Sequence, residues 1–161
     1  MLDLISPLAM RLVHSEDQNF LDVLFRDRRP DLLALPLPPN ALTQMISMQQ
    51  MSQSEGVKWS YPSAQDWVLC WGQDAIGRLI VDVGADVRLI DIAVLSSWRK
   101  RGIATHVLKA LQVHAAGIDK SISLAVQCDN QIARRVYQKA GFVLRSSDSL
   151  FDQMIWQPAE T

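Results

Sequence analysis

A basic loop that contains a glycine is the first place in this sequence where residue types and spacing suggest chemistry. Residues 98–105 read WRKRGIAT and join a predicted strand to a predicted helix. A helix start presents backbone N–H groups without intrahelical acceptors and roughly half a positive charge, and the small residues Gly102 and Ala104 would let a phosphate come close to them. Three consecutive basic side chains add positive charge: Arg99, Lys100 and Arg101. The loop therefore predicts a site for a diphosphate.

A second group of spaced residues lies downstream, on a predicted helix that follows another strand. Asn130, Ala133 and Tyr137 are three and four residues apart, so their side chains project from one side of that helix. Asn130 can cap the helix start with its amide oxygen and also reach a ligand. The loop at 98–105 lacks the spaced glycines and the Lys-Ser/Thr ending of a P-loop, and alone it fits a solvated basic turn as well as an anion site.

The elements that must position these residues alternate between strand and helix patterns. Apolar runs bounded by turn residues predict strands, and apolar residues at three- and four-residue intervals predict helices. The expected strands cover 9–13, 66–71, 76–83, 87–95, 122–126, 142–145 and 150–156, and the expected helices cover 16–28, 40–52, 102–117 and 130–140. This order predicts an α+β domain with a mixed sheet, in which the unit over 87–126 is a right-handed parallel crossover.

The segment between the N-terminal helices and the first hairpin carries weaker signals. Methionines at three-residue spacing, Met45, Met48 and Met51, predict the face of the 40–52 helix that packs on the core. The same pliable side chains could instead face a substrate cleft. The polar stretch 54–64 predicts turns.

Composition sets the outer bounds on function. The 161 residues fit one domain, and 48% hydrophobic with 20% charged residues is an ordinary balance for a globular protein. A net charge of −1 argues against nucleic acid or an anionic membrane as partner. Two distant cysteines exclude a disulfide framework and the usual zinc motifs, so no metal is expected. The N-terminus does not have the positive start of a signal peptide, so a cytoplasmic location is expected.

Three motifs in order resemble the GNAT superfamily of N-acetyltransferases. They are the strand at 89–94, Arg-x-x-Gly-x-Ala at 99–104, and Asn-x-x-Ala-x-x-x-Tyr-x-x-x-Gly-Phe at 130–142. The resemblance implies a mixed, mostly antiparallel sheet of six to seven strands, splayed at the CoA site and flanked by about four helices. It also implies one acyltransferase domain over 1–161. Within it, 1–64 would shape the acceptor site, 65–142 would bind acyl-CoA, and 143–161 would supply the last strands.

The resemblance also implies which residues bind acetyl-CoA as co-substrate. The pantetheine arm would pair with main-chain groups of Ile92, Ala93 and Val94, where two parallel strands splay apart. The pyrophosphate would lie on the loop formed by Arg99, Lys100, Arg101, Gly102, Ile103, Ala104 and Thr105. Asn130, Ala133 and Tyr137 would lie beside the pantetheine region.

Tyr137 matches the family's usual general acid, which acts when an amine attacks the thioester directly in a ternary complex. A phenol with a pKa near ~10 can donate a proton to a departing thiolate whose thiol has a pKa near ~8.5. The base stays unknown. Asp91 is a weak candidate, because a structural carboxylate that caps or pairs is the favoured interpretation, and a water chain could serve instead.

Several alternatives stay open at this level. The chain could be a catalytically silent acyl-CoA-binding module of the same fold, and a nucleic-acid-binding domain is a distant second. The acceptor, a small-molecule or peptide amine, has no signature, and the protein could be a monomer or a homodimer. Candidate residues for the acceptor cleft are two aromatics and three acids: Trp59, Tyr61, Asp17, Asp31 and Glu55.

Overall fold

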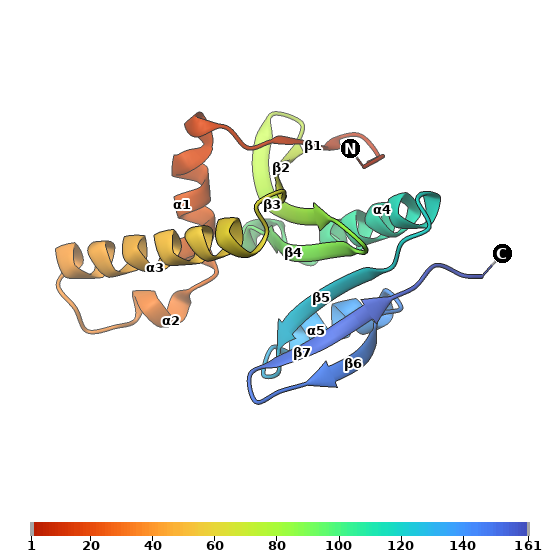
Figure 1. Ribbon diagram of the computed structural model, residues 1–161. Helices are drawn as coiled ribbons and strands as arrows, with labels where there is room; N and C mark the ends of the chain where they lie inside the picture. The colour runs from red at the N-terminus through yellow and green to blue at the C-terminus, as the bar shows by residue number, and fades with distance from the viewer. Residues whose placement is uncertain (1, 161) are drawn as a thin grey trace.

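The computed structural model describes residues 2–160. Seven strands form one sheet in the spatial order β1-β2-β3-β4-β5-β7-β6 (Figure 1). The strands are β1 (Leu8–Leu12), β2 (Gln65–Trp71), β3 (Asp74–Val83), β4 (Val87–Val94), β5 (Ile122–Gln127), β6 (Val143–Ser147) and β7 (Phe151–Trp156). The helices are α1 (Gln18–Asp27), α2 (Pro30–Leu33), α3 (Pro39–Ser60), α4 (Ile103–Gly117) and α5 (Gln131–Lys139), with short 3-10 turns η1 (Ser15–Asp17) and η2 (Ser96–Trp98). The predicted α+β fold is confirmed.

The sheet is antiparallel except at its centre. Strands β1 to β4 form a meander, and β5, β7 and β6 form a second antiparallel set. The two sets join where β4 and β5 run parallel, because helix α4 carries the chain back across the sheet. A parallel pair needs such a crossover, which the helical spacing after residue 102 predicted.

Helices cover both faces of the sheet (Figure 1). On β3, Leu79 and Val81 belong to the main core together with the buried side of α4, whereas Ile80 between them faces α1 and α3. This alternation follows from the two-residue period of a strand. The predicted apolar stripe of α4 is confirmed, and its buried members are Ile103, Val107, Leu108, Leu111 and Ala115.

Helix α3 departs most from the sequence prediction. It continues to Ser60, so the turns predicted over 54–64 are wrong for most of that stretch. The straight-chain polar residues there favour helix, and no proline interrupts it before Pro62. The methionine stripe is also not the core face, because Met48 and Met51 are 70% and 61% exposed and Ile46 makes the buried contact. The alternative prediction, a methionine that faces a cleft, is confirmed for Met51, which lines the cleft described below. The side of α3 that faces the sheet is largely polar because it lines a cleft, so apolar spacing misplaced it.

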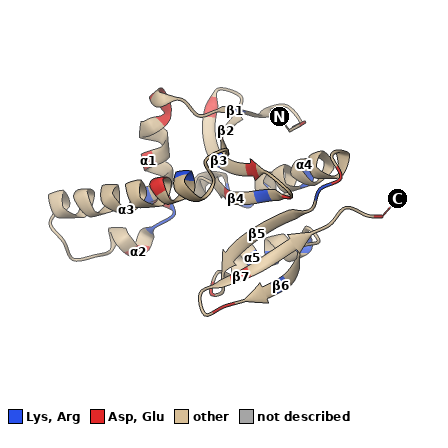
Figure 2. Cartoon of the chain, viewed as in Figure 1, with Lys and Arg blue, Asp and Glu red and all other residues tan. Residues whose placement is uncertain are grey.

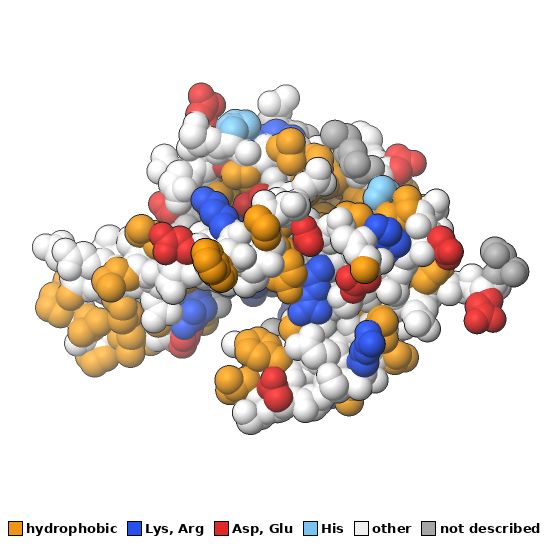
Figure 3. Space-filling view, viewed as in Figure 1, with side chains coloured by type: hydrophobic (Ala, Val, Ile, Leu, Met, Phe, Trp, Pro, Cys, Tyr) orange, Lys and Arg blue, Asp and Glu red, His pale blue; other side chains and the backbone are white. Residues whose placement is uncertain are grey.

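The short helix α2 occupies a segment where the sequence predicted only a break. Pro30 at its first turn is compatible with a helix start, and Leu32 is buried. Hydrophobic side chains gather on the outer part of α2 and α3 in Figure 3. Between residues 33 and 48, the exposed large hydrophobic residues are Leu33, Leu35, Leu37 and Met48. Figure 2 shows acidic and basic residues interspersed along the chain, and none of the described helices is long and apolar enough to cross a bilayer.

Candidate functional site

The central feature of the site is the divergence of β4 from β5. Their ladder pairs Val87 with Ile122 and ends at Leu89 with Leu124, although β4 continues to Val94. A bulge in the β3–β4 ladder coincides with this point, since Ile80 pairs with Asp91 and Val81 pairs with Leu89. The predicted splay is thus confirmed, and the main chain of β4 from about Ile92 onward has no strand partner on its β5 side.

The loop after β4 has the backbone geometry of an anion site. Lys100 and Gly102 have positive φ angles of 61° and 74°, and such alternating conformations turn successive N–H groups toward one side. Gly102 is the N-cap of α4, and no side chain caps that helix start. A Cβ atom at Gly102 would meet nothing within 4 Å, so the space in front of the loop is open. The residues present therefore fit a diphosphate, as the sequence predicted.

The side chains of the loop contribute less than its backbone. The Nε of Arg99 donates to the carbonyl of Val94 at 3.1 Å, and its Nη2 lies 3.5 Å from Asp27. The guanidinium of Arg101 stacks 4.6 Å from the ring centre of Trp98. Two of the three basic side chains are therefore held against the protein, and Ile103 is buried in the core. Lys100, Ala104 and Thr105 lie at the surface or partly exposed.

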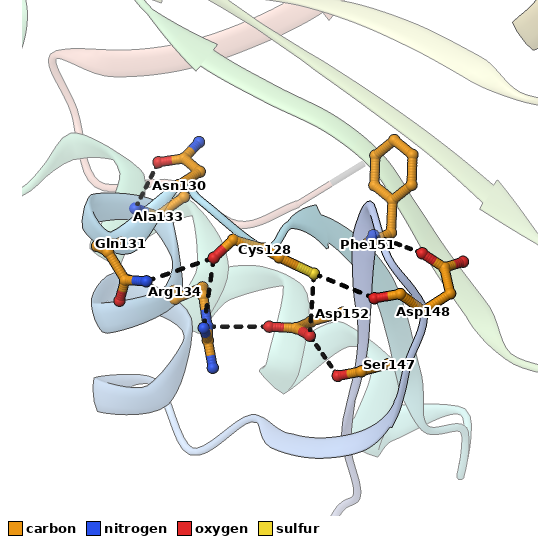
Figure 4. A network of polar contacts seen from close by, with 9 residues as sticks. All are labelled: Cys128, Asn130, Gln131, Ala133, Arg134, Ser147, Asp148, Phe151 and Asp152. Carbon is orange, nitrogen blue, oxygen red and sulfur yellow. Dashed lines mark hydrogen bonds and ion pairs between the residues drawn. The ribbon is translucent and has the colours of Figure 1, made fainter.

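Helix α5 brings Asn130, Ala133 and Tyr137 to the end of β5. The Oδ1 of Asn130 accepts the N–H of Ala133 at 3.1 Å, so the predicted cap is present. No side chain of α5 is fully buried, but Ala133, Val136 and Tyr137 pack partly buried against the core. Polar contacts also join the helix to the sheet (Figure 4). Arg134 forms an ion pair at 3.0 Å with Asp152, which is itself only 4% exposed on β7. Burial and the neighbouring Asp152 raise the pKa of Cys128, whose thiol donates to that carboxylate.

Tyr137 is partly buried and packs from α5 against the core. Its ring meets Phe142 edge to face, with centres 5.8 Å apart. Burial, reinforced by the negative charge of Asp91 and opposed by Arg28, raises the pKa of Tyr137 to about 12. The phenol is therefore protonated at neutral pH, which is the state a proton donor needs.

Asp91, the weak candidate for a base, is bound through both carboxylate oxygens. Arg28 at the end of α1 donates to them at 2.9 and 3.0 Å. Sequence reasoning missed Arg28, because nothing local connects a helix terminus to a strand 63 residues away. This ion pair is the structural role that the sequence analysis gave as the alternative to a catalytic base at Asp91.

A cleft of about 720 Å³ lies between α1, α3 and strands β2 to β4. Its floor carries two ion pairs, Arg28 with Asp91 and Arg78 with Asp66, and the Nε of Arg78 donates to Asp66 at 2.8 Å. The strand register could have suggested the second pair, because Asp66 and Arg78 occupy neighbouring rows of β2 and β3.

The structure separates the predicted cleft residues into two groups. Tyr61 and Glu55 line the cleft. Trp59 is 91% exposed and is not among the lining residues. Asp17 is buried against Arg11, and Asp31 pairs with Arg29, so neither carboxylate is available to a cleft ligand.

Comparison with known proteins agrees with this geometry. The sequence model of the Acetyltransferase (GNAT) family matches residues 30–142, more than half of the chain. The fold is similar to PaiA N-acetyltransferase from Thermoplasma acidophilum in complex with coenzyme A, with a TM-score of 0.68 and 16% identity over 94% of this chain and 99% of that chain. No curated protein matches the sequence.

Two further solved structures share the fold. RimL, a ribosomal L7/L12 alpha-N-protein acetyltransferase in complex with coenzyme A, has a TM-score of 0.68 and 15% identity over 97% of both chains. Spermidine N-acetyltransferase from Vibrio cholerae, in complex with CoA and spermine, has a TM-score of 0.62 and 16% identity over 95% of this chain and 96% of that chain. Identities this low support the fold alone, but the family match covers the splayed strands, the loop and helix α5. The chain belongs to the GNAT family of acetyltransferases.

Proposed function

We propose that this protein transfers an acetyl group from acetyl-CoA to a primary amine. The main support for the proposal is the start of α4, which has no side-chain cap and follows a loop with positive φ angles. This start lies next to β4, whose edge on the β5 side is unpaired beyond the splay. An anion site and a free strand edge match the two parts of CoA, a pyrophosphate and an amide-containing arm. The structures similar to this one include three in complex with CoA.

In this proposal each part of the site has one task. Backbone amides from Lys100 to Thr105 bind the pyrophosphate, and the main chain of Ile92 to Val94 pairs with the pantetheine arm. Asn130 and Ala133 border that arm. Acetyl-CoA supplies the acetyl thioester when it is bound.

Tyr137 acts on the leaving group in this proposal. The amine nitrogen bonds to the acyl carbon, the carbon–sulfur bond breaks, and the hydroxyl of Tyr137 gives its proton to the departing thiolate sulfur. Solvent then returns a proton to the phenolate. Because its pKa is raised, the phenol stays protonated over the whole physiological pH range. The cleft between α1 and α3 orients the amine. We assign no side chain as base, because Arg28 engages both oxygens of Asp91, and we propose that water in the cleft carries the amine proton away.

The size of the cleft limits the acceptor only broadly. A volume of about 720 Å³ accommodates either a small amine or the end of a peptide. Two of the similar structures are enzymes named for such acceptors, one for a protein α-amine and one for spermidine. We therefore propose a small-molecule or peptide amine as acceptor.

Two measurements test the proposal in sequence. Calorimetric titration with CoA should show binding, and free thiol should then be released from acetyl-CoA with at least one member of a panel of polyamines, amino acids, aminoglycosides and peptides. Mass spectrometry of the acceptor should show the added acetyl group. Absence of CoA binding would overturn the proposal. Binding without turnover on any amine would identify a silent acyl-CoA-binding module instead.

A further inference from the structure

The C-terminal end of α1 contacts the donor side of the site at two points, through consecutive residues. Arg28 binds Asp91 within β4, and Asp27 reaches the segment that follows β4. The same helix lines the acceptor cleft with Leu24, Phe25 and Arg28. Helix α1 therefore touches both the cleft and the loop that we assign to the pyrophosphate.

Asp27 makes two contacts with Ser96, in the turn that precedes that loop, and one with Arg99, within the loop. One oxygen accepts the backbone N–H of Ser96 at 2.8 Å, and the other accepts the Ser96 hydroxyl at 2.6 Å. The first oxygen also lies 3.5 Å from the Nη2 of Arg99. Burial opposes ionisation of this carboxyl, but the hydrogen bonds from Ser96 and the charge of Arg99 outweigh it, and the pKa of Asp27 is lowered. Its carboxylate is thus charged at neutral pH and bound on both oxygens.

These contacts fix the path of the chain immediately before the anion site. Ser96 is the first residue of the η2 turn. Arg99, which follows this turn, donates its Nε to the carbonyl of Val94 at the end of β4. Asp27 therefore contacts both ends of the η2 turn, and Arg99 connects the turn back to the end of β4. The next residues, Lys100 and Gly102, adopt the positive φ angles that orient the loop amides. Glycine adopts such a conformation without steric cost, but for Lys100 it is uncommon and persists where surrounding contacts impose it.

We infer that Asp27 is a positioning residue for the anion-binding loop, supplied by a helix of the acceptor side. The inference rests on the proposed function, because the pyrophosphate of CoA is the ligand whose binding it predicts. Asp27 does not itself touch the ligand. It acts through Ser96 and Arg99, and its location in α1 links the donor loop to the wall of the acceptor cleft.

The test measures CoA affinity by calorimetric titration in four proteins. Asp27→Ala removes all three contacts and should weaken CoA binding about ten-fold, the effect of losing a charge-assisted hydrogen-bond set. Asp27→Asn retains one carbonyl acceptor for Ser96 and should weaken binding about three-fold, since it loses the charge facing Arg99. Asp31→Ala removes a surface carboxylate paired with Arg29 in the neighbouring helix, and it should bind CoA like the wild type.

Hydrogen exchange of the unliganded proteins supplies a second readout. Amides of residues 96–105 should exchange faster in the Asp27 variants, while amides of α5 keep their wild-type rates, because the effect is local to the loop. A general loss of structure would accelerate both regions. If Asp27→Ala does not fold, Asp27→Asn still decides the question. CoA affinity and loop exchange equal to wild type in a folded Asp27 variant would overturn the inference. A wild type that fails to bind CoA would instead overturn the proposed function, and hydrogen exchange would still show whether Asp27 orders the loop.

Discussion

Helices α4 and α5 occupy corresponding places, each following one of the two parallel strands at the splayed end of the sheet. Their N-terminal ends differ. The start of α4 has no side-chain cap and a glycine at a φ of 74°, whereas the side chain of Asn130 closes the start of α5. Their anchoring differs as well, since α4 has five buried side chains over 15 residues and α5 has none over nine.

The two differences are connected. Apolar burial anchors α4 to the core, so its first N–H groups can stay free for a ligand without loosening the helix. Helix α5 packs on the core only through partly buried side chains, namely Ala133, Val136 and Tyr137. Polar contacts therefore contribute more to its anchoring: its cap, the ion pair of Arg134 with Asp152, and the amide of Gln112 donating to Ala140 at 2.6 Å. We infer a division of tasks in which α4 binds the anion and α5 positions Tyr137.

The largest expected effect comes from removing one oxygen atom from α5. Tyr137→Phe should lower turnover at least about 100-fold, the usual contribution of general acid catalysis. Its CoA affinity should change little, because the anion site lies on α4. Thiol release and calorimetric titration measure the two quantities. Tyr61→Phe, which removes the hydroxyl from a cleft-lining tyrosine, is the matched control. Equal losses in turnover and CoA affinity in Tyr137→Phe would break the division of tasks.

The pH dependence of the wild type tests the same phenol without a substitution. Because burial raises the pKa of Tyr137 to about 12, the donor should keep its proton through the alkaline range. The value of kcat/KM should therefore rise as the acceptor amine loses its proton and should show no falling limb up to pH ~10. A decline that begins near pH 9 and disappears in Tyr137→Phe would show an ordinary, solvent-exposed phenol.

Replacing the glycine at the start of α4 should have the next largest effect, a loss of CoA affinity. Gly102→Val places a branched side chain at a positive φ, which costs about 1–2 kcal/mol, and puts Cβ where the phosphate approaches. CoA affinity should fall at least about ten-fold. Gly72→Val has the same strain at a φ of 60° in the β2–β3 turn, with nothing within 4 Å of its Cβ. It should lose similar stability and keep its CoA affinity, so equal affinity in the two variants would refute an anion site at Gly102.

A substitution at the start of α5 should instead change the stability of the protein. Asn130→Ala removes the acceptor for the N–H of Ala133 and should lower the free energy of unfolding by about 1 kcal/mol. Asn130→Asp keeps an acceptor oxygen and should recover most of that loss. Urea denaturation measures both. An unchanged midpoint in Asn130→Ala would mean that the cap contributes nothing and that α5 is held by its other contacts.

The local features of the side that we propose for the donor were predictable from sequence. A glycine before a helix, a capping asparagine three residues ahead of Ala133, and a tyrosine on the same helix side all lie within 99–142. Each of these features follows from a short-range rule about backbone conformation or helix geometry, so no tertiary information was needed to predict it. The splay itself came from family resemblance, since no residue between Ile90 and Val94 marks where the ladder ends.

The acceptor side was not predictable for the opposite reason. Its ion pair between Arg28 and Asp91 joins residues 63 apart, and its walls come from two helices and three strands. The inner side of α3 is polar, with the amide of Gln50 donating to Asp22 at 2.8 Å across the cleft. A periodicity rule assumes that the apolar side faces inward. That assumption fails where a helix lines a cleft, which is how the methionines were misplaced.

The smallest expected effect separates the backbone of the loop from its charge. Lys100→Asn removes an exposed positive charge from the anion site but retains a residue type that tolerates the positive φ of 61°. An exposed charge contributes at most about 1 kcal/mol, so CoA affinity should fall less than about five-fold and should become less sensitive to salt. Titrations at two ionic strengths measure this, with Lys109→Asn on the exposed side of α4 as the control. If Lys100→Asn weakened binding as much as Gly102→Val, side-chain charge would be the main determinant, and the uncapped start of α4 would no longer explain why the anion binds there.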